Sequence, residues 1–214
     1  PLMMALKQKV TRVLIADDVG VGKTIEAGLI VRELLDRGEI ARCAVLCPPH
    51  LVDQWVGELQ DRFNIGAEGL TASNAARLER SVPHGALFDH YPFMVVSLDY
   101  IKTDRHRDNF LHMAPECVVV DEAHTCTLRG REQQLRFELL QKLAGDETRH
   151  LLLLTATPHS GDDDAFYNLL SLLNRDFLAL KEAGANRQKL RERLARYFVQ
   201  RRRKDIEEWR DQNF

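Results

Sequence analysis

The chain has 214 residues, of which 44% are hydrophobic and 29% are charged, and its formal net charge is −2. This composition is typical of a soluble globular protein, and the length suffices to bury the core of one large α/β domain. Because the longest aliphatic run is too short to cross a bilayer and no secretion signal opens the sequence, we expect a cytoplasmic protein without a membrane partner, nucleoid-associated if bacterial.

Short apolar runs alternate with segments of helical spacing along the chain. The first predicted strand covers 13–16, and a helix is expected from Gly22 to about Arg37, where Gly38 ends it. The other predicted elements are, in chain order, a strand over 43–47, a helix over 51–59, strands over 93–97 and 117–120, a helix over 132–143, a strand over 150–154 and a helix over 164–173. Strands that are apolar on both faces and separated by helices predict a mostly parallel sheet with helices on both faces.

The four cysteines are Cys43, Cys47, Cys117 and Cys126, and they form no Cys-x-x-Cys pair. A metal site could be built from Cys43, Cys47 and His50. Buried thiols in a reducing cytosol are the simpler interpretation, because three of the four cysteines lie in apolar, strand-like runs.

A glycine-containing loop joins the first predicted strand to the first predicted helix, and it reads Asp17-Asp18-Val19-Gly20-Val21-Gly22-Lys23-Thr24. Glycines at these positions let the backbone turn tightly and direct its N–H groups at phosphate oxygens, and the helix N-terminus adds a favourable dipole. Lys23 is expected on the β- and γ-phosphates, and Thr24 on Mg²⁺. The predicted nucleotide-binding residues are Gly20, Val21, Gly22, Lys23, Thr24 and Ile25.

Asp17 occupies the position where the standard phosphate-loop pattern has a glycine, and Asp18 follows it. Two carboxylates beside an anion site are unexpected, because like charges repel. They either hydrogen-bond to loop N–H groups or hold water on the magnesium, or they simply point away into solvent. The sequence leaves these alternatives open.

Two adjacent carboxylates, Asp121 and Glu122, end the predicted strand over 117–120. Adjacent side chains at a strand end diverge, so each can take a separate task. Asp121 would hold Mg²⁺, directly or through water, and Glu122 would orient and polarise the attacking water. Together with Lys23 they are the predicted catalytic residues.

A third segment, Thr155-Ala156-Thr157-Pro158, follows the predicted strand over 150–154. It is the kind of segment that reports the state of a bound phosphate to another part of the protein. His124 would link Thr155 and Thr157 to the carboxylate pair, or would only fill space beside them.

These segments resemble those of the Swi/Snf-type ATPases of helicase superfamily two, particularly the bacterial branch near the RNA-polymerase-associated ATPase. The matching segments, in family order, are 16–28, 47–55, 96–100, 121–124 and 154–159, with weaker similarity over 166–174 and 201–206. In this family an aspartate is usual at the position of Asp17, which explains its departure from the standard pattern.

The resemblance implies one of two RecA-like lobes that close on ATP and Mg²⁺ and step along double-stranded DNA. We expect residues 1–185 to form the N-terminal RecA-like lobe, a P-loop NTPase fold, and residues 186–214 to form a basic helical segment that leads toward a second lobe of the full-length protein. The second lobe supplies arginines to the ATP site, and such an arginine is worth about 10³ to 10⁵ in rate. The chain alone is therefore predicted to bind nucleotide and to hydrolyse it negligibly.

By the same resemblance, Pro49, His50, Gln54 and Ser97 lie in or beside segments that track one DNA strand. Contacts of this kind reach phosphates without reading bases. Trp55 shares helical spacing with apolar neighbours, which favours a place in the core. Nine basic residues and one acidic residue lie between Arg187 and Lys204, and this segment could contact DNA, the second lobe or only solvent.

Two other functions stay open at the level of sequence. One is a helicase that separates DNA or RNA strands, and the other is a nucleotide-binding scaffold without turnover. The Thr-Ala-Thr-Pro segment and the Gln54-Trp55 pair favour the translocase, and the intact Lys23, Asp121 and Glu122 argue against a scaffold.

Overall fold

The computed structural model describes residues 1–18, 20, 22–83, 86–127, 130–157, 163–181 and 192–201. These residues form one seven-stranded sheet in which every neighbouring pair of strands is parallel. The strands are β1 (Arg12–Ile15), β2 (Cys43–Cys47), β3 (Glu68–Leu70), β4 (Phe93–Ser97), β5 (Cys117–Val120), β6 (His150–Leu154) and β7 (Phe198–Val199), in the spatial order β3-β4-β2-β5-β6-β1-β7.

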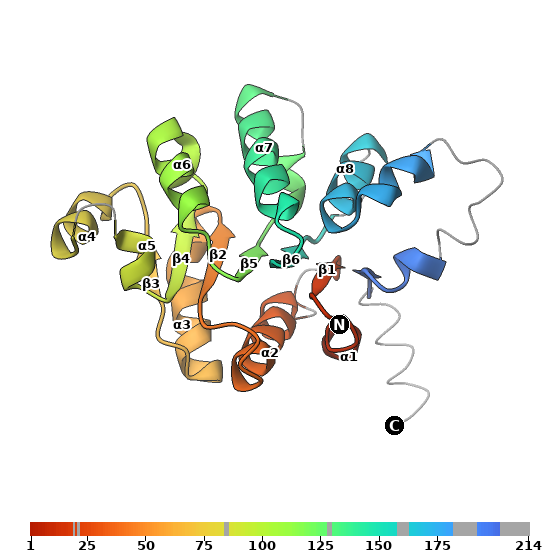
Figure 1. Cartoon of the computed structure of the whole chain (residues 1–214), viewed down its shortest axis with the longest axis horizontal. Helices are drawn as coiled ribbons and strands as arrows, with labels where there is room; N and C mark the ends of the chain where they lie inside the picture. The colour runs from red at the N-terminus through yellow and green to blue at the C-terminus, as the bar shows by residue number, and fades with distance from the viewer. Residues whose placement is uncertain are drawn as a thin grey trace.

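Helices cover both faces of the sheet (Figure 1). One face carries α1 (Leu2–Ala5), α2 (Lys23–Asp36) and α3 (Val52–Phe63), and the other carries α4 (Ala75–Ser81), α5 (Leu87–His90), α6 (Asp104–His112), α7 (Arg131–Gly145) and α8 (Asp163–Leu173). The described part also contains the 3₁₀ turns η1 (Pro49–Leu51), η2 (Tyr100–Lys102), η3 (Ala123–Cys126) and η4 (Arg175–Lys181), and a helical turn over residues 192–194. None of the described helices is both long and apolar enough to span a membrane.

The hydrophobic core forms two clusters, one on each face of the sheet. Successive side chains of a strand point to opposite faces, so Val13 and Ile15 enter the cluster under α2 and α3 while Leu14 enters the cluster under α7 and α8. Both faces of the central strands are buried, which explains why these strands are continuously apolar in sequence.

The predicted α/β fold with a mostly parallel sheet is confirmed, and the strands over 43–47, 93–97, 117–120 and 150–154 have the predicted limits. The helix predicted from Gly22 to about Arg37 is α2, which ends before Gly38, and the φ of 69° at Gly38 suits glycine. The four cysteines are buried and free, and no group of metal-ligating side chains occurs among the described residues.

Of the predicted helical segment over 186–214, only residues 192–201 are described: residues 192–194 are helical, a turn covers 195–197, and an extended stretch follows. Phe198 and Val199 form β7, which pairs with β1, and Tyr197 and Phe198 pack against the core. This apolar stretch covers what would otherwise be an open edge at β1. The compact domain thus includes Arg201, whereas residues 202–214 lie outside the described residues.

Candidate nucleotide site

The three predicted motifs meet at the carboxyl-terminal edge of the sheet. Because β6 lies between β5 and β1, the phosphate loop after β1, Thr155 after β6 and Asp121 after β5 follow one another along this edge. The N–H of Thr155 donates to the carbonyl of Ile15 at 3.0 Å, so the segments that leave β6 and β1 start side by side. In open parallel sheets ligands bind at this edge.

The phosphate loop has the backbone conformation that its glycines allow. Gly20 has a φ of 82° and Gly22 a φ of 102°, values that only glycine adopts without strain. Gly22 is the N-cap of α2, which begins at Lys23, so the free N–H groups of the first helical turn face the loop. Val19 and Val21, the second of them a predicted binding residue, lie outside the described residues.

Lys23 bends back over the loop. Its ammonium donates to the carbonyl of Asp17 at 2.7 Å and to the carbonyl of Asp18 at 3.4 Å. Thr24 and Ile25 follow in the first turn of α2 and are half-buried. The loop thus gathers an ammonium, a hydroxyl and a helix N-terminus, which are the groups that bind a polyphosphate and its metal.

Asp17 is fully buried and bound to Arg201, so it does not point away into solvent. One carboxylate oxygen accepts the Arg201 backbone N–H at 2.8 Å, and the other accepts its Nε–H at 2.9 Å and contacts Nη2. Arg201 also pairs with Glu26 on α2 at 2.8 Å, and these two carboxylates raise the pKa of its guanidinium. Asp17 therefore joins the phosphate loop to the end of β7.

Asp121 is almost buried and is held from both sides. Its Oδ2 accepts the indole N–H of Trp55 at 2.8 Å, and its Oδ1 accepts the backbone N–H of Glu122, also at 2.8 Å. Burial and the nearby Asp121 carboxylate raise the pKa of the Cys47 thiol to about 12, so this cysteine is neutral. Trp55 is buried in the core, as predicted, and has in addition a polar contact with the site.

Glu122 has a left-handed backbone conformation, with φ 50° and ψ 42°. For a residue other than glycine this conformation costs about 1–3 kcal/mol and persists only where neighbours fix it. Here the Glu122 carbonyl accepts the N–H of Thr125 at 2.9 Å and its hydroxyl at 2.8 Å. The turn separates the Glu122 side chain from that of Asp121, which suits two separate tasks.

His124 connects the carboxylate pair with the segment after β6. Its Nδ1 lies 2.9 Å from the hydroxyl oxygen of Thr155 and 3.3 Å from a carboxylate oxygen of Glu122. The N–H of Thr157 donates to the same Thr155 hydroxyl at 3.1 Å. His124 thus contacts both Thr155 and Glu122, which was one of the two alternatives that the sequence left open. That these contacts couple the two motifs stays a prediction. Pro158 lies outside the described residues.

The predicted DNA contacts differ in exposure. Pro49, His50 and Gln54 are exposed where β2 leads through η1 into α3, at the same edge of the sheet as the phosphate loop. Ser97 is buried, with 1% of its surface exposed, and its hydroxyl accepts the N–H of Asp99 at 3.2 Å. The side chain of Ser97 therefore supports its loop and does not form part of the exposed surface.

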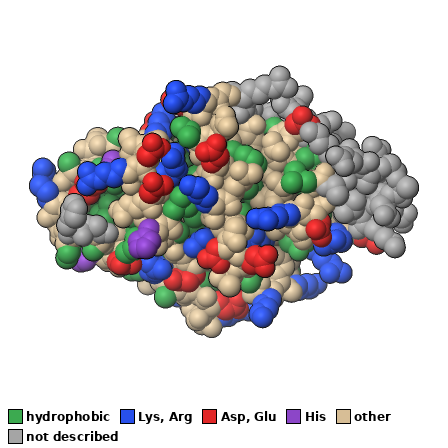
Figure 2. All heavy atoms as spheres, turned by 45° about the horizontal axis from the view of Figure 1, so that its top comes forward, with side chains coloured by type: hydrophobic (Ala, Val, Ile, Leu, Met, Phe, Trp, Pro, Cys, Tyr) green, Lys and Arg blue, Asp and Glu red, His purple; other side chains and the backbone are tan. Residues whose placement is uncertain are grey.

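Charge is mixed on the face shown in Figure 2, where Lys and Arg side chains lie among Asp and Glu side chains. Ion pairs also join α7 to the segment around η2: Lys102 lies 3.3 Å from Glu132, and Arg136 lies 3.3 Å from Asp99. Such pairing offsets positive charge that a polyanion would otherwise meet.

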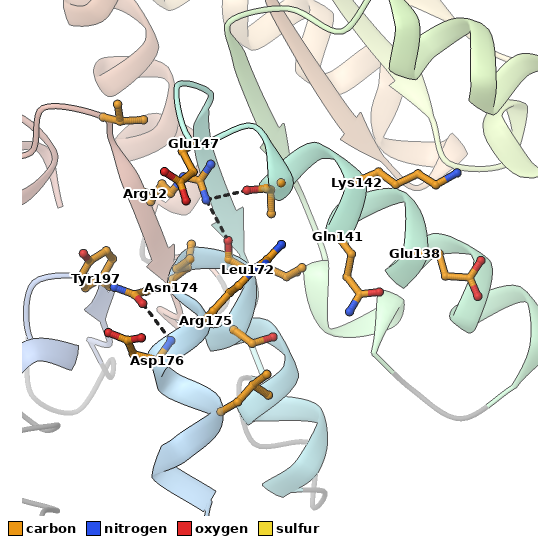
Figure 3. Close-up of a pocket in the computed structure, with 16 residues that line it drawn as sticks. Arg12, Glu138, Gln141, Lys142, Glu147, Leu172, Asn174, Arg175, Asp176 and Tyr197 are labelled. Carbon is orange, nitrogen blue, oxygen red and sulfur yellow. Dashed lines mark hydrogen bonds between the residues drawn. The ribbon is translucent and has the colours of Figure 1, made fainter.

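A cavity of about 1050 Å³ lies at the opposite edge of the sheet, away from the three motifs. Arg12, at the start of β1, donates there to the carbonyl of Ala144 at 3.0 Å and to that of Leu172 at 3.4 Å (Figure 3). The guanidinium thus satisfies carbonyls at the ends of α7 and α8, which have no partner within their helices. Gln8 accepts the N–H of Arg12 at this edge, far from the phosphate loop.

The sequence does not identify two residues, Arg201 and Trp55, as part of the site. Arg201 reaches Asp17 across 184 positions of sequence, and Trp55 reaches Asp121 across 66. The sequence signal for Arg201 is the unexplained carboxylate of Asp17, because a buried carboxylate needs a cation beside it. The signal for Trp55 was its indole N–H, because a buried indole usually finds an acceptor.

Comparison with curated proteins gives relatives of similar sequence. YqhH of Bacillus subtilis (strain 168), named an uncharacterized ATP-dependent helicase, is 34% identical over 178 residues, and the RNA polymerase-associated protein RapA of Stutzerimonas stutzeri (strain A1501) is 36% identical over 164 residues. These alignments cover 81% and 76% of this chain but 29% and 17% of the relatives, so the chain spans less than a third of their length.

Solved structures of similar fold include a Sulfolobus solfataricus SWI2/SNF2 ATPase core in complex with dsDNA, with a TM-score of 0.66 and 16% identity over 89% of this chain and 40% of that chain. The ATPase core domain from the same organism gives a TM-score of 0.62 at 18% identity, over 88% of this chain and 38% of that chain. At this identity the likeness establishes the α/β fold of a RecA-like lobe. Residues 1–209 match the SNF2-related domain, and the chain therefore belongs to this family.

Proposed function

We propose that the chain is the first motor lobe of an ATP-dependent translocase that moves along double-stranded DNA. The observation that carries the proposal is the row of three motifs on the ends of β1, β6 and β5, in which His124 joins the motif after β6 to the motif after β5. Family membership supports an ATPase domain of helicase type, and a neighbour of similar fold was solved with dsDNA. The exposed Pro49, His50 and Gln54 lie at the same edge, where they could meet a phosphate backbone.

Within this site each side chain has a task that its position supports. Lys23 and the N–H groups around Gly20 and Gly22 would bind the phosphates, while Thr24 and Asp121 would hold Mg²⁺. When bound, Mg²⁺ would neutralise charge on the β- and γ-phosphates. Glu122, held by its turn and by His124, would orient the attacking water and accept its proton.

We further propose that the chain by itself hydrolyses ATP negligibly. In phosphoryl transfer an arginine supplied from a second domain is worth about 10³ to 10⁵ in rate. Arg201 contacts the phosphate loop at Asp17, but its guanidinium is already engaged by Asp17 and Glu26. A second lobe of the full-length protein would therefore complete the site.

The test is phosphate release from ATP by this chain and by a longer protein that contains this domain and a second lobe. We expect negligible release by the chain, and release by the longer protein that duplex DNA stimulates more than single-stranded DNA or RNA. In the longer protein, Glu122→Gln should abolish release while nucleotide binding remains.

Stimulated turnover by the chain alone would contradict the need for a second lobe. Stimulation by RNA alone would instead favour a strand-separating helicase. A longer protein that binds nucleotide yet stays inactive with every nucleic acid would favour a scaffold.

A further inference from the structure

The contact between Trp55 and Asp121 joins two parts of the fold that the sequence treats separately. Trp55 belongs to α3, which follows β2, whereas Asp121 ends β5. The indole N–H donates to Oδ2 of Asp121 at 2.8 Å, and both residues are buried, Trp55 with 2% and Asp121 with 7% of its surface exposed. Water therefore has little access to this hydrogen bond. If the indole donor is removed, water does not readily replace it at the Asp121 oxygen.

The geometry leaves Asp121 able to serve a metal. Among the described residues, its Oδ1 accepts one N–H, from Glu122, and its Oδ2 accepts one N–H, from Trp55. An ionised carboxylate has about four acceptor sites, so each oxygen keeps capacity for Mg²⁺ or for a water bound to it. The two donors fix the plane of the carboxylate, which leaves the remaining acceptor positions in defined directions.

We propose that Trp55 is a positioning residue for the metal-binding carboxylate Asp121, acting through its indole N–H. The inference rests on the proposed Mg²⁺–nucleotide site and adds to it a residue that touches neither nucleotide nor metal. Groups that hydrogen-bond to metal ligands orient them, and their replacement typically lowers metal affinity 10- to 100-fold. Trp55 fills this place for Asp121.

The position of Trp55 also makes α3 part of the metal site. Gln54, the preceding residue, is exposed on the same helix, and His50 is exposed in the turn before it. Adjacent helical residues point in directions about 100° apart, so one turn of α3 faces both the exterior and Asp121.

The experiment measures the dissociation constant of the non-hydrolysable ATP analogue AMP-PNP, once with Mg²⁺ and once with EDTA. The ratio of the two constants gives the gain in affinity that Mg²⁺ provides. Trp55→Phe keeps most of the apolar side chain and removes the N–H donor. We expect this variant to reduce the Mg²⁺ gain about tenfold, while its affinity in EDTA stays that of the wild type.

Two controls separate positioning from packing. Leu59→Ala, at a buried position one turn further along α3, should lower the melting temperature but leave the Mg²⁺ gain unchanged. Asp121→Asn should remove the gain, and adding Trp55→Phe to it should cause no further loss, because the two residues then act through one contact.

A wild-type Mg²⁺ gain in Trp55→Phe would overturn the inference and leave the proposed function intact. No binding of AMP-PNP by the wild type under either condition would overturn the proposed function and the inference together. If Trp55→Phe fails to fold, Trp209→Phe leaves Trp55 as the sole tryptophan. Its fluorescence should then change when Mg²⁺ is added with AMP-PNP and should not change in the Asp121→Asn background; an unchanged emission in both would overturn the inference.

Discussion

Asp17 and His150 are buried polar residues at opposite ends of the strands, and each hydrogen-bonds to a partner in the described part of the chain. Asp17 has its carboxylate against Arg201, and His150 accepts the backbone N–H of Thr11 at its Nδ1, at 3.1 Å. A buried polar group that loses its partner is destabilising, because neither water nor another group replaces the lost bond. These contacts therefore make quantitative predictions.

Arg201→Gln should destabilise the fold by about 3 kcal/mol, the lower end of the range for breaking a buried ion pair. The lower end applies because the Arg201 side chain is 34% exposed, whereas that of Asp17 is 0% exposed. Urea denaturation measures the difference in free energy of unfolding. Asp17→Asn combined with Arg201→Gln should recover part of the loss, since no unpaired carboxylate then remains.

The matched control is Arg32→Gln, which breaks an exposed pair with Asp36 on α2. Exposed pairs one helical turn apart contribute little to stability, because solvent and salt screen them. Equal effects of the two arginine substitutions would contradict the structural role of Arg201.

His150 should make stability depend on pH. Burial lowers its pKa below the ordinary value of 6.5; Arg12 acts in the same direction and Glu39 in the opposite one. Below about pH 6.5 the unfolded chain binds a proton at this residue that the folded chain does not bind, so stability is lost as pH falls until the folded pKa is reached. The slope is at most about 1.4 kcal/mol per pH unit for one group.

His150→Asn keeps an acceptor for the Thr11 N–H and removes the titration. Thermal melts of the wild type and of this variant between pH 8 and pH 5 should therefore diverge, with the wild type losing more stability toward low pH. Parallel curves would show that His150 does not titrate differently in the folded and unfolded chains.

At the scale of elements, α2 and α3 approach closely at Gly28. A Cβ at this position would lie 2.1 Å from the ring of Phe63, which is shorter than any real contact. Gly28 thus lets α3 pack against the helix of the phosphate loop, and this packing helps to place both Lys23 and Trp55.

Gly28→Ala should lower the free energy of unfolding by about 1–3 kcal/mol, because the Phe63 ring must move. Helix propensity acts in the opposite direction, by roughly 1 kcal/mol in favour of alanine. Gly57→Ala on α3 meets no atom within 4 Å and should instead stabilise the protein. Denaturant unfolding of the two variants distinguishes these outcomes, and a stabilised Gly28→Ala variant would contradict the close approach.

The elements that could be predicted from sequence are those whose pattern is complete within a few residues. Four predicted strands, such as 43–47, have the predicted limits, whereas β1 (Arg12–Ile15) begins and ends one residue before the predicted 13–16. The motifs predict Lys23, Asp121 and His124 because their chemistry is local, and the roles of these residues stay predictions. The strands β3, with three residues, and β7, with two, are too short to carry a period and form only because a neighbouring strand offers an edge. Arg201 and Trp55 join the site through tertiary contacts, which no local pattern encodes.

For the whole molecule, the sheet order decides what the site can do. The consecutive strands β5, β6 and β1 place the carboxylate pair, Thr155 and the phosphate loop along one edge, and β7 closes the adjacent side by binding Asp17 through Arg201. The chain spans only 29% and 17% of the curated relatives it matches, so movement along DNA is proposed for a larger protein. Nucleotide binding, in contrast, is proposed for these residues themselves.

Isothermal titration of the chain with ATP and Mg²⁺ tests this claim most directly. The wild type should bind, and Lys23→Ala should abolish detectable binding because the ammonium is the only full positive charge placed on the loop by its own motif. Lys142→Ala, on α7 at the distant cavity, should bind like the wild type. No binding by the wild type, or equal affinity in Lys23→Ala, would contradict the assignment of this site.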